Sequence, residues 1–204
     1  RIPQKESGAT VMGELVNRGE SAIVPEGFYK QVSSILNAAR DKAYTAVNFA
    51  MVEAYWEIGK SIVDEQGGEG RAKYGDALID ELAVRLTKEF GRGFNARSLR
   101  YMRQFYLAFP IRNALRSELN WTHYRRLSRI TDPDARTWYM NECADSRWST
   151  RQLERQINTM FRERLLASKD KEAVTQEIQK SAPARRPEDI IRDPYVLEFL
   201  GFSD

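Results

Sequence analysis

Arginine is the residue whose type and spacing suggest chemistry in this chain. The 204 residues include 23 arginines and 9 lysines. The stretch from Arg97 to Arg129 holds eight arginines and one acidic residue, for a net charge of +7. The stretch from Glu53 to Glu89 holds five basic and nine acidic residues, for a net charge of −4. Because a guanidinium group matches phosphate oxygens and guanine edges, the arginine block favours a surface that binds a polyanion; a solvated helix face is the alternative.

Residues suited to catalysis or metal binding are scarce. The chain has one cysteine, Cys143, and one histidine, His123, which excludes a disulfide framework and a cysteine or histidine metal cluster within it. Residues 59–61 resemble the end of a phosphate-binding loop, but the earlier glycine is missing and the stretch lies inside an expected helix. We therefore predict no catalytic residue, no metal site and no cofactor in these residues.

Two short segments with one shared pattern introduce arginine-bearing helices. Residues 94–99 and 148–153 each place an aromatic residue before an N-cap residue and a leucine five positions after the aromatic, which is the pattern of a hydrophobic staple. Each segment follows a helix and a tight connection. The regions near 76–109 and 132–165 are therefore candidates for helix-turn-helix elements, and ordinary helix capping is the alternative.

We predict that eight side chains contact DNA. Recognition helices present their N-terminal residues to base edges, to which arginine and glutamine are suited. The groove-facing set is Arg97, Arg100, Arg103 and Gln104. The phosphate-contacting set is Arg125, Arg126, Arg151 and Arg155.

The elements that must position these side chains are helices. Apolar residues recur at spacings of three and four, and no alternating strand pattern is convincing. We predict an all-α fold, a helical domain with a long N-terminal helix and helix-turn-helix, winged-helix-like elements. We expect helices over 28–66, 76–90, 95–109, 111–119 and 121–130, then from 133, and from 149 to 164 or beyond.

Composition also suggests how the chain is organised. Residues 1–27 are expected to form a flexible arm, residues 28–180 the helical domain, and residues 181–204 a linker with the first residues of a further domain. The small residues along the seam of the 28–66 helix suggest a homodimer through that helix, or a kinked helix packed within one monomer. No apolar run reaches the length of a membrane helix and no signal peptide is evident, so we predict a cytoplasmic protein with no membrane contact.

Five stretches carry a pattern seen in a known family: 55–60, 86–94, 102–110, 148–157 and 192–200. With them the sequence resembles the N-terminal domain of the bacterial YhcG family over roughly residues 28–204. In that family a helical domain of helix-turn-helix type precedes a PD-(D/E)xK nuclease domain. The resemblance implies that the full-length protein is a Mg²⁺-dependent nuclease, whose nuclease domain would begin where this sequence ends, so no catalytic residue is carried over here.

The combined prediction is a non-catalytic, self-associating domain that targets a bacterial nuclease to DNA. Duplex DNA is the expected partner. A protein-interaction module, for example one that binds restriction-modification components, is one alternative. An RNA binder is another, because the arginines and nearby aromatic residues also suit stacking on bases.

Overall fold

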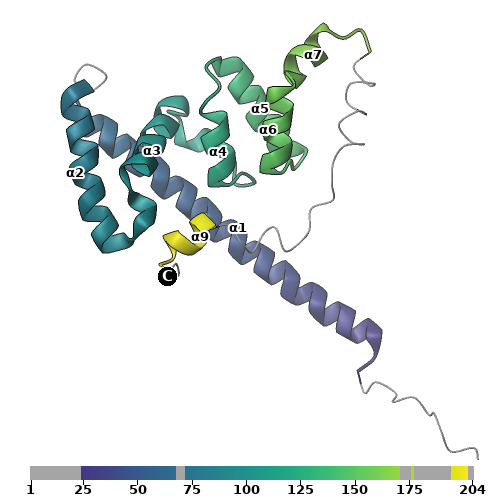
Figure 1. Cartoon of the computed structure of the whole chain (residues 1–204). Helices are drawn as coiled ribbons and strands as arrows, with labels where there is room; N and C mark the ends of the chain where they lie inside the picture. Colours follow the sequence, from purple (N-terminus) through teal and green to yellow (C-terminus); the bar gives the residue numbers. More distant parts are fainter. Residues whose placement is uncertain (1–23, 68–71, 171–175, 177–193, 202–204) are drawn as a thin grey trace, which may run out of the picture. The chain divides into compact units, whose positions relative to one another are not determined.

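The computed structural model describes residues 24–67, 72–170, 176 and 194–201, and no strand occurs among them. The predicted all-α fold with a long N-terminal helix is confirmed (Figure 1). Residues 1–23 of the predicted arm (1–27) and residues 181–193 of the predicted linker segment (181–204) lie outside the described residues, and α1 begins within the arm, at Glu26. The helices are α1 (Glu26–Glu65), α2 (Ala72–Phe90), η1 (Arg92–Phe94), α3 (Ala96–Ala108), η2 (Arg112–Ala114), α4 (Trp121–Leu127), α5 (Pro133–Asp145), α6 (Thr150–Asn158), α7 (Phe161–Ala167) and α9 (Pro194–Phe199).

The chain divides into two compact units, residues 1–39 and 40–204. Of the first unit the structure describes residues 24–39, of which 26–39 form the N-terminal part of α1, and they are largely exposed. The second unit contains the hydrophobic core and every predicted site residue. Among the described residues, no helix combines the length and the apolar character needed to cross a bilayer.

Two expected helices differ from the structure. The stretch 111–119 contains only the short η2, because the backbone becomes extended at Leu115 (φ −69°, ψ 138°). The helix expected from 149 to 164 is divided into α6 and α7 by Met160, whose φ of 51° is left-handed. A left-handed residue cannot continue an α-helix, so α7 leaves in a new direction.

The core of the second unit is built where the C-terminal half of α1 meets α3 and α4. Tyr55 of α1 and Trp121 of α4 contact each other edge-on, with ring centroids 4.9 Å apart. Phe105 of α3 packs against the same indole at 5.6 Å. Trp56 of α1 donates a hydrogen bond of 2.6 Å to the carbonyl oxygen of Phe109, just after α3. Each fully buried side chain of this size contributes roughly 1.5–3 kcal/mol.

Gly59 allows α1 and α3 to approach closely. A Cβ atom at this position would lie 2.1 Å from the carbonyl oxygen of Met102. No side chain fits that distance without a shift of the backbone. The glycine in the stretch that resembles a phosphate-binding loop is therefore a packing residue within a helix.

Caps fix where the predicted DNA-contacting helices begin. The side chain of Asn95 accepts a hydrogen bond of 3.0 Å from the amide of Ser98, which starts α3. Ser149 and Gln152 form a reciprocal capping box at the start of α6, and Trp148 just before it is buried. The two helix starts that the staple pattern predicts are confirmed.

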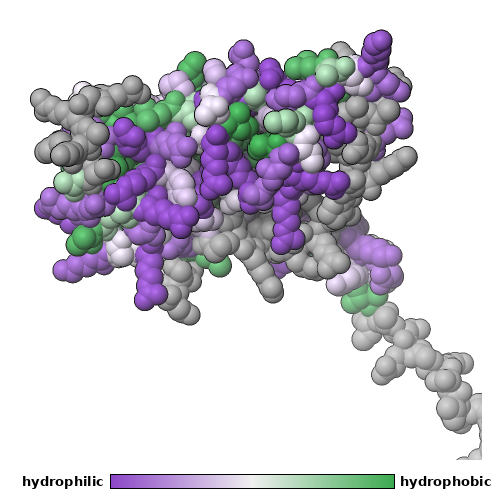
Figure 2. Space-filling model, turned by 45° about the horizontal axis from the view of Figure 1, so that its top comes forward, coloured by the Kyte–Doolittle hydropathy of each residue, from purple (hydrophilic) through white to green (hydrophobic). Residues whose placement is uncertain are grey.

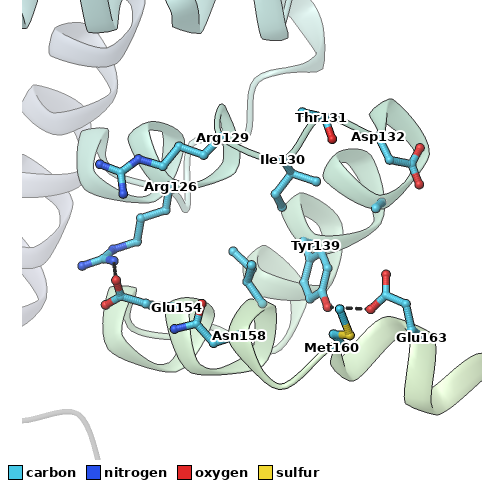
Figure 3. Close-up of a pocket in the computed structure, with 12 residues that line it drawn as sticks. Arg126, Arg129, Ile130, Thr131, Asp132, Tyr139, Glu154, Asn158, Met160 and Glu163 are labelled. Carbon is cyan, nitrogen blue, oxygen red and sulfur yellow. Dashed lines mark hydrogen bonds and ion pairs between the residues drawn. The ribbon is translucent and has the colours of Figure 1, made fainter.

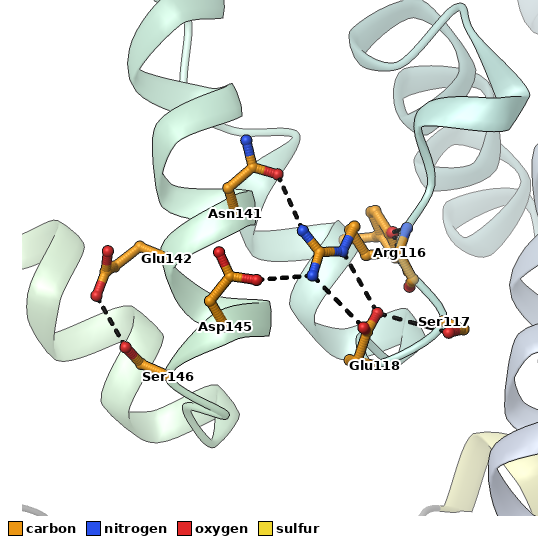
Figure 4. A network of polar contacts seen from close by, with 8 residues as sticks. Arg116, Ser117, Glu118, Asn141, Glu142, Asp145 and Ser146 are labelled. Atoms are coloured by element: carbon orange, nitrogen blue, oxygen red, sulfur yellow. Dashed lines mark hydrogen bonds and ion pairs between the residues drawn. The ribbon is translucent and has the colours of Figure 1, made fainter.

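A polar network ties the loop before α4 to α5 (Figure 4). The guanidinium group of Arg116 forms an ion pair of 2.7 Å with Asp145 and a second one of 3.4 Å with Glu118. The backbone amide of Arg116 donates to the hydroxyl of Tyr124, 2.6 Å away. This arginine of the charged block therefore serves the fold.

Candidate nucleic-acid interface

Helix α3 has one buried apolar side and one exposed polar side, as the spacing of its apolar residues predicts. Leu99, Met102 and Phe105 are buried, while the residues Arg97, Arg100 and Gln104 are exposed. The hydrophobic side thus anchors the helix and leaves a polar side outward.

All four predicted α3 side chains already have partners within the chain, and three of them reach a neighbouring helix or turn. Arg100 forms an ion pair of 2.8 Å with Asp80 of α2. Arg103 donates a hydrogen bond of 2.7 Å to the side chain of Gln66, just after α1. Gln104 donates one of 3.1 Å to the carbonyl oxygen of Ser128, at the end of α4. These contacts connect α3 to its neighbours, and a contact with DNA would have to replace them.

Arg97 and Arg125 hold a tyrosine between them. Arg97 donates a hydrogen bond of 3.2 Å to the hydroxyl of Tyr101, and the guanidinium carbon of Arg125 lies 4.3 Å from the centroid of that ring. The hydrogen bond from Arg97, followed by that from Arg125, lowers the pKa of Tyr101 to about 8. Arginine stabilises a neighbouring phenolate because the guanidinium group stays charged at this pH.

Helix α9 covers the other side of Arg125. The hydroxyl of Tyr195 accepts a hydrogen bond from Arg125, and the guanidinium carbon lies 5.5 Å from the Tyr195 ring centroid. Val196 is buried, and Phe199 packs edge-on against Tyr55 at 6.1 Å. Arg125 is therefore enclosed by aromatic rings from α3 and α9.

The arginines of α6 differ from those of α3. Arg151 and Arg155 are exposed, lie one turn apart, and have no side-chain partner among the described residues. Leu153 and Gln156 on the opposite side of α6 are buried. Side chains at i and i+4 share one face of a helix, so α6 presents two unpaired guanidinium groups in the same direction.

The C-terminal end of α4 lies beside α6 and adds two further arginines. Arg126 forms an ion pair with Glu154 of α6. Arg129, just after α4, is exposed and lacks a side-chain partner in the described part of the chain. We define the α4–α6 surface by Arg126, Arg129, Arg151 and Arg155. Hydrophilic side chains cover most of the face seen in Figure 2, and hydrophobic ones gather there only in small patches.

A pocket of about 440 Å³ opens between the turn after α4 and the bend from α6 to α7 (Figure 3). Its apolar walls include Ile130, Ile157 and Met160, and Tyr139 lies in its middle. Sequence reasoning missed this pocket. Its lining residues are spread along the sequence from 126 to 163. The local feature that shapes it is the left-handed backbone at Met160, and a methionine gives no sequence signal for such a conformation.

Groups suited to metal binding do not gather in the described residues. No cluster of three or more histidine, cysteine or acidic side chains occurs among them. His123 forms the capping box of α4 with Asn120, and its Nε2 lies 3.0 Å from the carbonyl oxygen of Trp148. Cys143 is buried. Both residues therefore contribute to the fold.

Comparison with known proteins assigns the class of this helical, arginine-rich domain. Residues 31–164 match the DUF1016 N-terminal domain, and the chain belongs to that family. It is 39% identical over 206 residues to the Escherichia coli (strain K12) protein named "Putative nuclease YhcG", an alignment that covers 83% of this chain and 54% of the relative. The chain thus spans about half the length of that curated relative. No solved structure matches.

Proposed function

We propose that this domain binds duplex DNA through the α4–α6 surface and so targets a nuclease. The observation that carries the proposal is the pair Arg151 and Arg155, both exposed and unpaired among the described residues. The capping box at Ser149 fixes where α6 begins and therefore which way the two side chains point. Contacts from arginine and lysine to phosphates supply a large share of the affinity of DNA-binding proteins.

Contacts from α3 form the second part of the proposal. Arg97, Arg100, Arg103 and Gln104 would read base edges, and Arg125 would contact a phosphate, once their present partners are exchanged for DNA. The pair between Arg100 and Asp80 is partly exposed, with 44% and 60% of the two side chains accessible. An ion pair of this kind contributes about 0–1 kcal/mol, so a phosphate or a base can replace Asp80 at little cost.

The nuclease activity belongs to the proposal for the whole protein. The E. coli relative carries the name "Putative nuclease YhcG" and is longer than this chain. We propose that the full-length protein is a Mg²⁺-dependent nuclease whose catalytic residues lie outside these 204 residues. The domain described here is then a non-catalytic targeting module.

Binding to three nucleic acids tests the proposed function. The chain is titrated into labelled duplex DNA, single-stranded DNA and duplex RNA, and fluorescence anisotropy is followed at low salt. We expect the tightest binding to duplex DNA. Tighter binding to RNA would support the RNA alternative, and no binding to any of the three would favour a protein-interaction module.

Self-association is a second proposed role, favoured by the N-terminal part of α1. In the first unit, large apolar side chains on this helix are 37–62% exposed. An exposed apolar cluster of this kind is typical of a surface that pairs with another helix. A second copy of the chain is the proposed partner. The side chains are Phe28, Tyr29, Val32, Ile35 and Leu36.

Light scattering after size-exclusion chromatography tests the dimer. We expect a dimer for the unmodified chain and a monomer for the double variant Ile35→Glu/Leu36→Glu. Val84→Glu, at a position of α2 that is 72% exposed, is the matched control and should leave the dimer intact. A monomer at high concentration for the unmodified chain would contradict this role.

A further inference from the structure

We infer that the pocket between α4 and α7 receives one unstacked base of the DNA bound on the α4–α6 surface. The inference rests on the proposed function, and it adds a site for a single nucleotide to a surface that otherwise contacts phosphates.

The size and walls of the pocket suit a nucleobase. Its volume of about 440 Å³ lies within the range of roughly 300–1,000 Å³ that is usual for small-molecule sites. Ile130, Ala135, Ile157 and the ring of Tyr139 provide apolar surface for a planar ring. The Tyr139 hydroxyl itself is engaged, since it accepts a hydrogen bond of 3.2 Å from the amide of Arg162.

Polar groups stand at the rim of the pocket, where the edge of a base would lie. Asn158 is exposed and has no side-chain partner among the described residues, so its amide can both donate and accept. The carboxylate of Glu163 lies on the side of the pocket away from the arginines (Figure 3). Amide and carboxylate groups match the donors and acceptors of a base edge.

The arginines at the mouth would hold the phosphate of the same nucleotide. Arg126 and Arg129 lie together on one side of the pocket and also belong to the α4–α6 surface (Figure 3). Arg126 is already paired with Glu154, whereas Arg129 is exposed without a side-chain partner among the described residues, so Arg129 has donors available for a phosphate. A strand that follows Arg151 and Arg155 along α6 would therefore reach the pocket at the end of that helix.

Met160 supplies a further, independent observation. It is a non-glycine residue with a left-handed φ of 51°, and its side chain is 64% exposed at the rim. Left-handed backbone is unfavourable for such residues and occurs preferentially at functional sites. A polarisable thioether packs well against an aromatic ring, which is the shape of the proposed occupant.

A duplex with one unpaired adenine provides the test. Removing a base from the stack is easiest when the base has no pairing partner. We expect about tenfold tighter binding to this duplex than to a fully paired one, in line with the usual contribution of one stacked base. When 2-aminopurine replaces the unpaired adenine, its fluorescence should change on binding, because its stacking environment changes.

Two variants and a matched control complete the experiment. Asn158→Trp fills the mouth of the pocket and Met160→Ala removes part of its wall; both positions are exposed, so the fold should tolerate them. For each variant, the affinity for the duplex with the unpaired adenine should become about equal to the affinity for the fully paired duplex. Asn113→Trp, at an exposed position outside the pocket, should keep the tenfold ratio.

The outcomes separate the inference from the proposed function. Equal affinity of the unmodified chain for both duplexes, or a tenfold ratio that survives Asn158→Trp and Met160→Ala, would overturn the base pocket while leaving duplex binding intact. No binding to either duplex would overturn the proposed function and the inference with it.

Discussion

At the scale of single residues, the structure separates arginines that look alike in the sequence. Arg136 donates hydrogen bonds to the carbonyl oxygens of Ala108 and Ile130, both 2.7 Å away. Arg116 joins a loop to α5, whereas Arg151 and Arg155 are exposed without a partner among the described residues. The sequence shows where arginines are concentrated, as in the stretch 97–129. It does not predict which arginines have internal partners, because those partners are brought together only by the fold.

Stability measurements on two arginine variants test this separation. Arg136→Gln leaves partly buried carbonyl oxygens without donors, so we expect a loss of about 1–3 kcal/mol in the free energy of unfolding. Arg151→Gln changes an exposed side chain and should alter that free energy by less than about 0.5 kcal/mol. Urea denaturation followed by circular dichroism measures both. Equal losses for the two variants would show that the assignment of Arg136 to the fold is wrong.

The tyrosine between Arg97 and Arg125 yields a prediction about pH. Tyr101 has a folded-state pKa of about 8, below the ordinary value of about 10. Its contribution to stability is therefore complete above pH ~10 and is lost as the pH falls through about 8. An ultraviolet absorbance titration should show one tyrosine that ionises near pH 8.

Variants assign that ionisation step. Tyr101→Phe should abolish the step near pH 8, and Arg97→Gln should move it upward, since Arg97 is the main cause of the shift. Tyr29→Phe, at an exposed position on α1, is the control and should leave the step in place. A step that persists in Tyr101→Phe would assign the low pKa to another group.

At the scale of elements, local sequence signals predicted helix starts better than helix ends. The staple and cap at Asn95 and Ser149 depend on neighbouring residues, and both are confirmed. Neither the break at Met160 nor the extended backbone at Leu115 has a proline or glycine at that position. The spacing of apolar residues therefore predicted helices that run through both positions. The pocket went unnoticed for the same reason, because the break at Met160 forms one of its walls.

The crossing of α1 and α3 provides the prediction at this scale. Gly59→Ala places a Cβ atom against the carbonyl oxygen of Met102, and we expect a loss of about 1–3 kcal/mol from overpacking. Gly27→Ala is the matched control on the same helix, because a Cβ atom there has nothing within 4 Å. Thermal unfolding measures both. A Gly59→Ala melting temperature equal to that of Gly27→Ala would mean that the two helices do not approach closely.

At the scale of the whole molecule, the domain resembles the N-terminal part of a longer protein. The family match covers residues 31–164, and the E. coli relative is about twice as long as the aligned region. Residues 194–199, beyond the family match, form α9, which packs on η1 and encloses Arg125. The resemblance at residues 192–200 predicted a junction here. Its docking beside the arginines could not be predicted, because it depends on contacts with residues about 70 or more positions away.

The central claim is that Arg151 and Arg155 contact DNA phosphates. Each phosphate contact contributes about −0.9 to the slope of log affinity against log salt concentration for duplex DNA. Lys60→Gln/Lys88→Gln removes two exposed charges from α1 and α2 and serves as the matched control for Arg151→Gln/Arg155→Gln.

The most direct measurement is the salt dependence of duplex DNA binding for the unmodified chain and these two double variants. We expect Arg151→Gln/Arg155→Gln to reduce the magnitude of the slope by about 2 and to weaken binding at every salt concentration, while the lysine control keeps the original slope. Equal slopes and affinities for the two double variants would contradict the claim that Arg151 and Arg155 contact DNA phosphates.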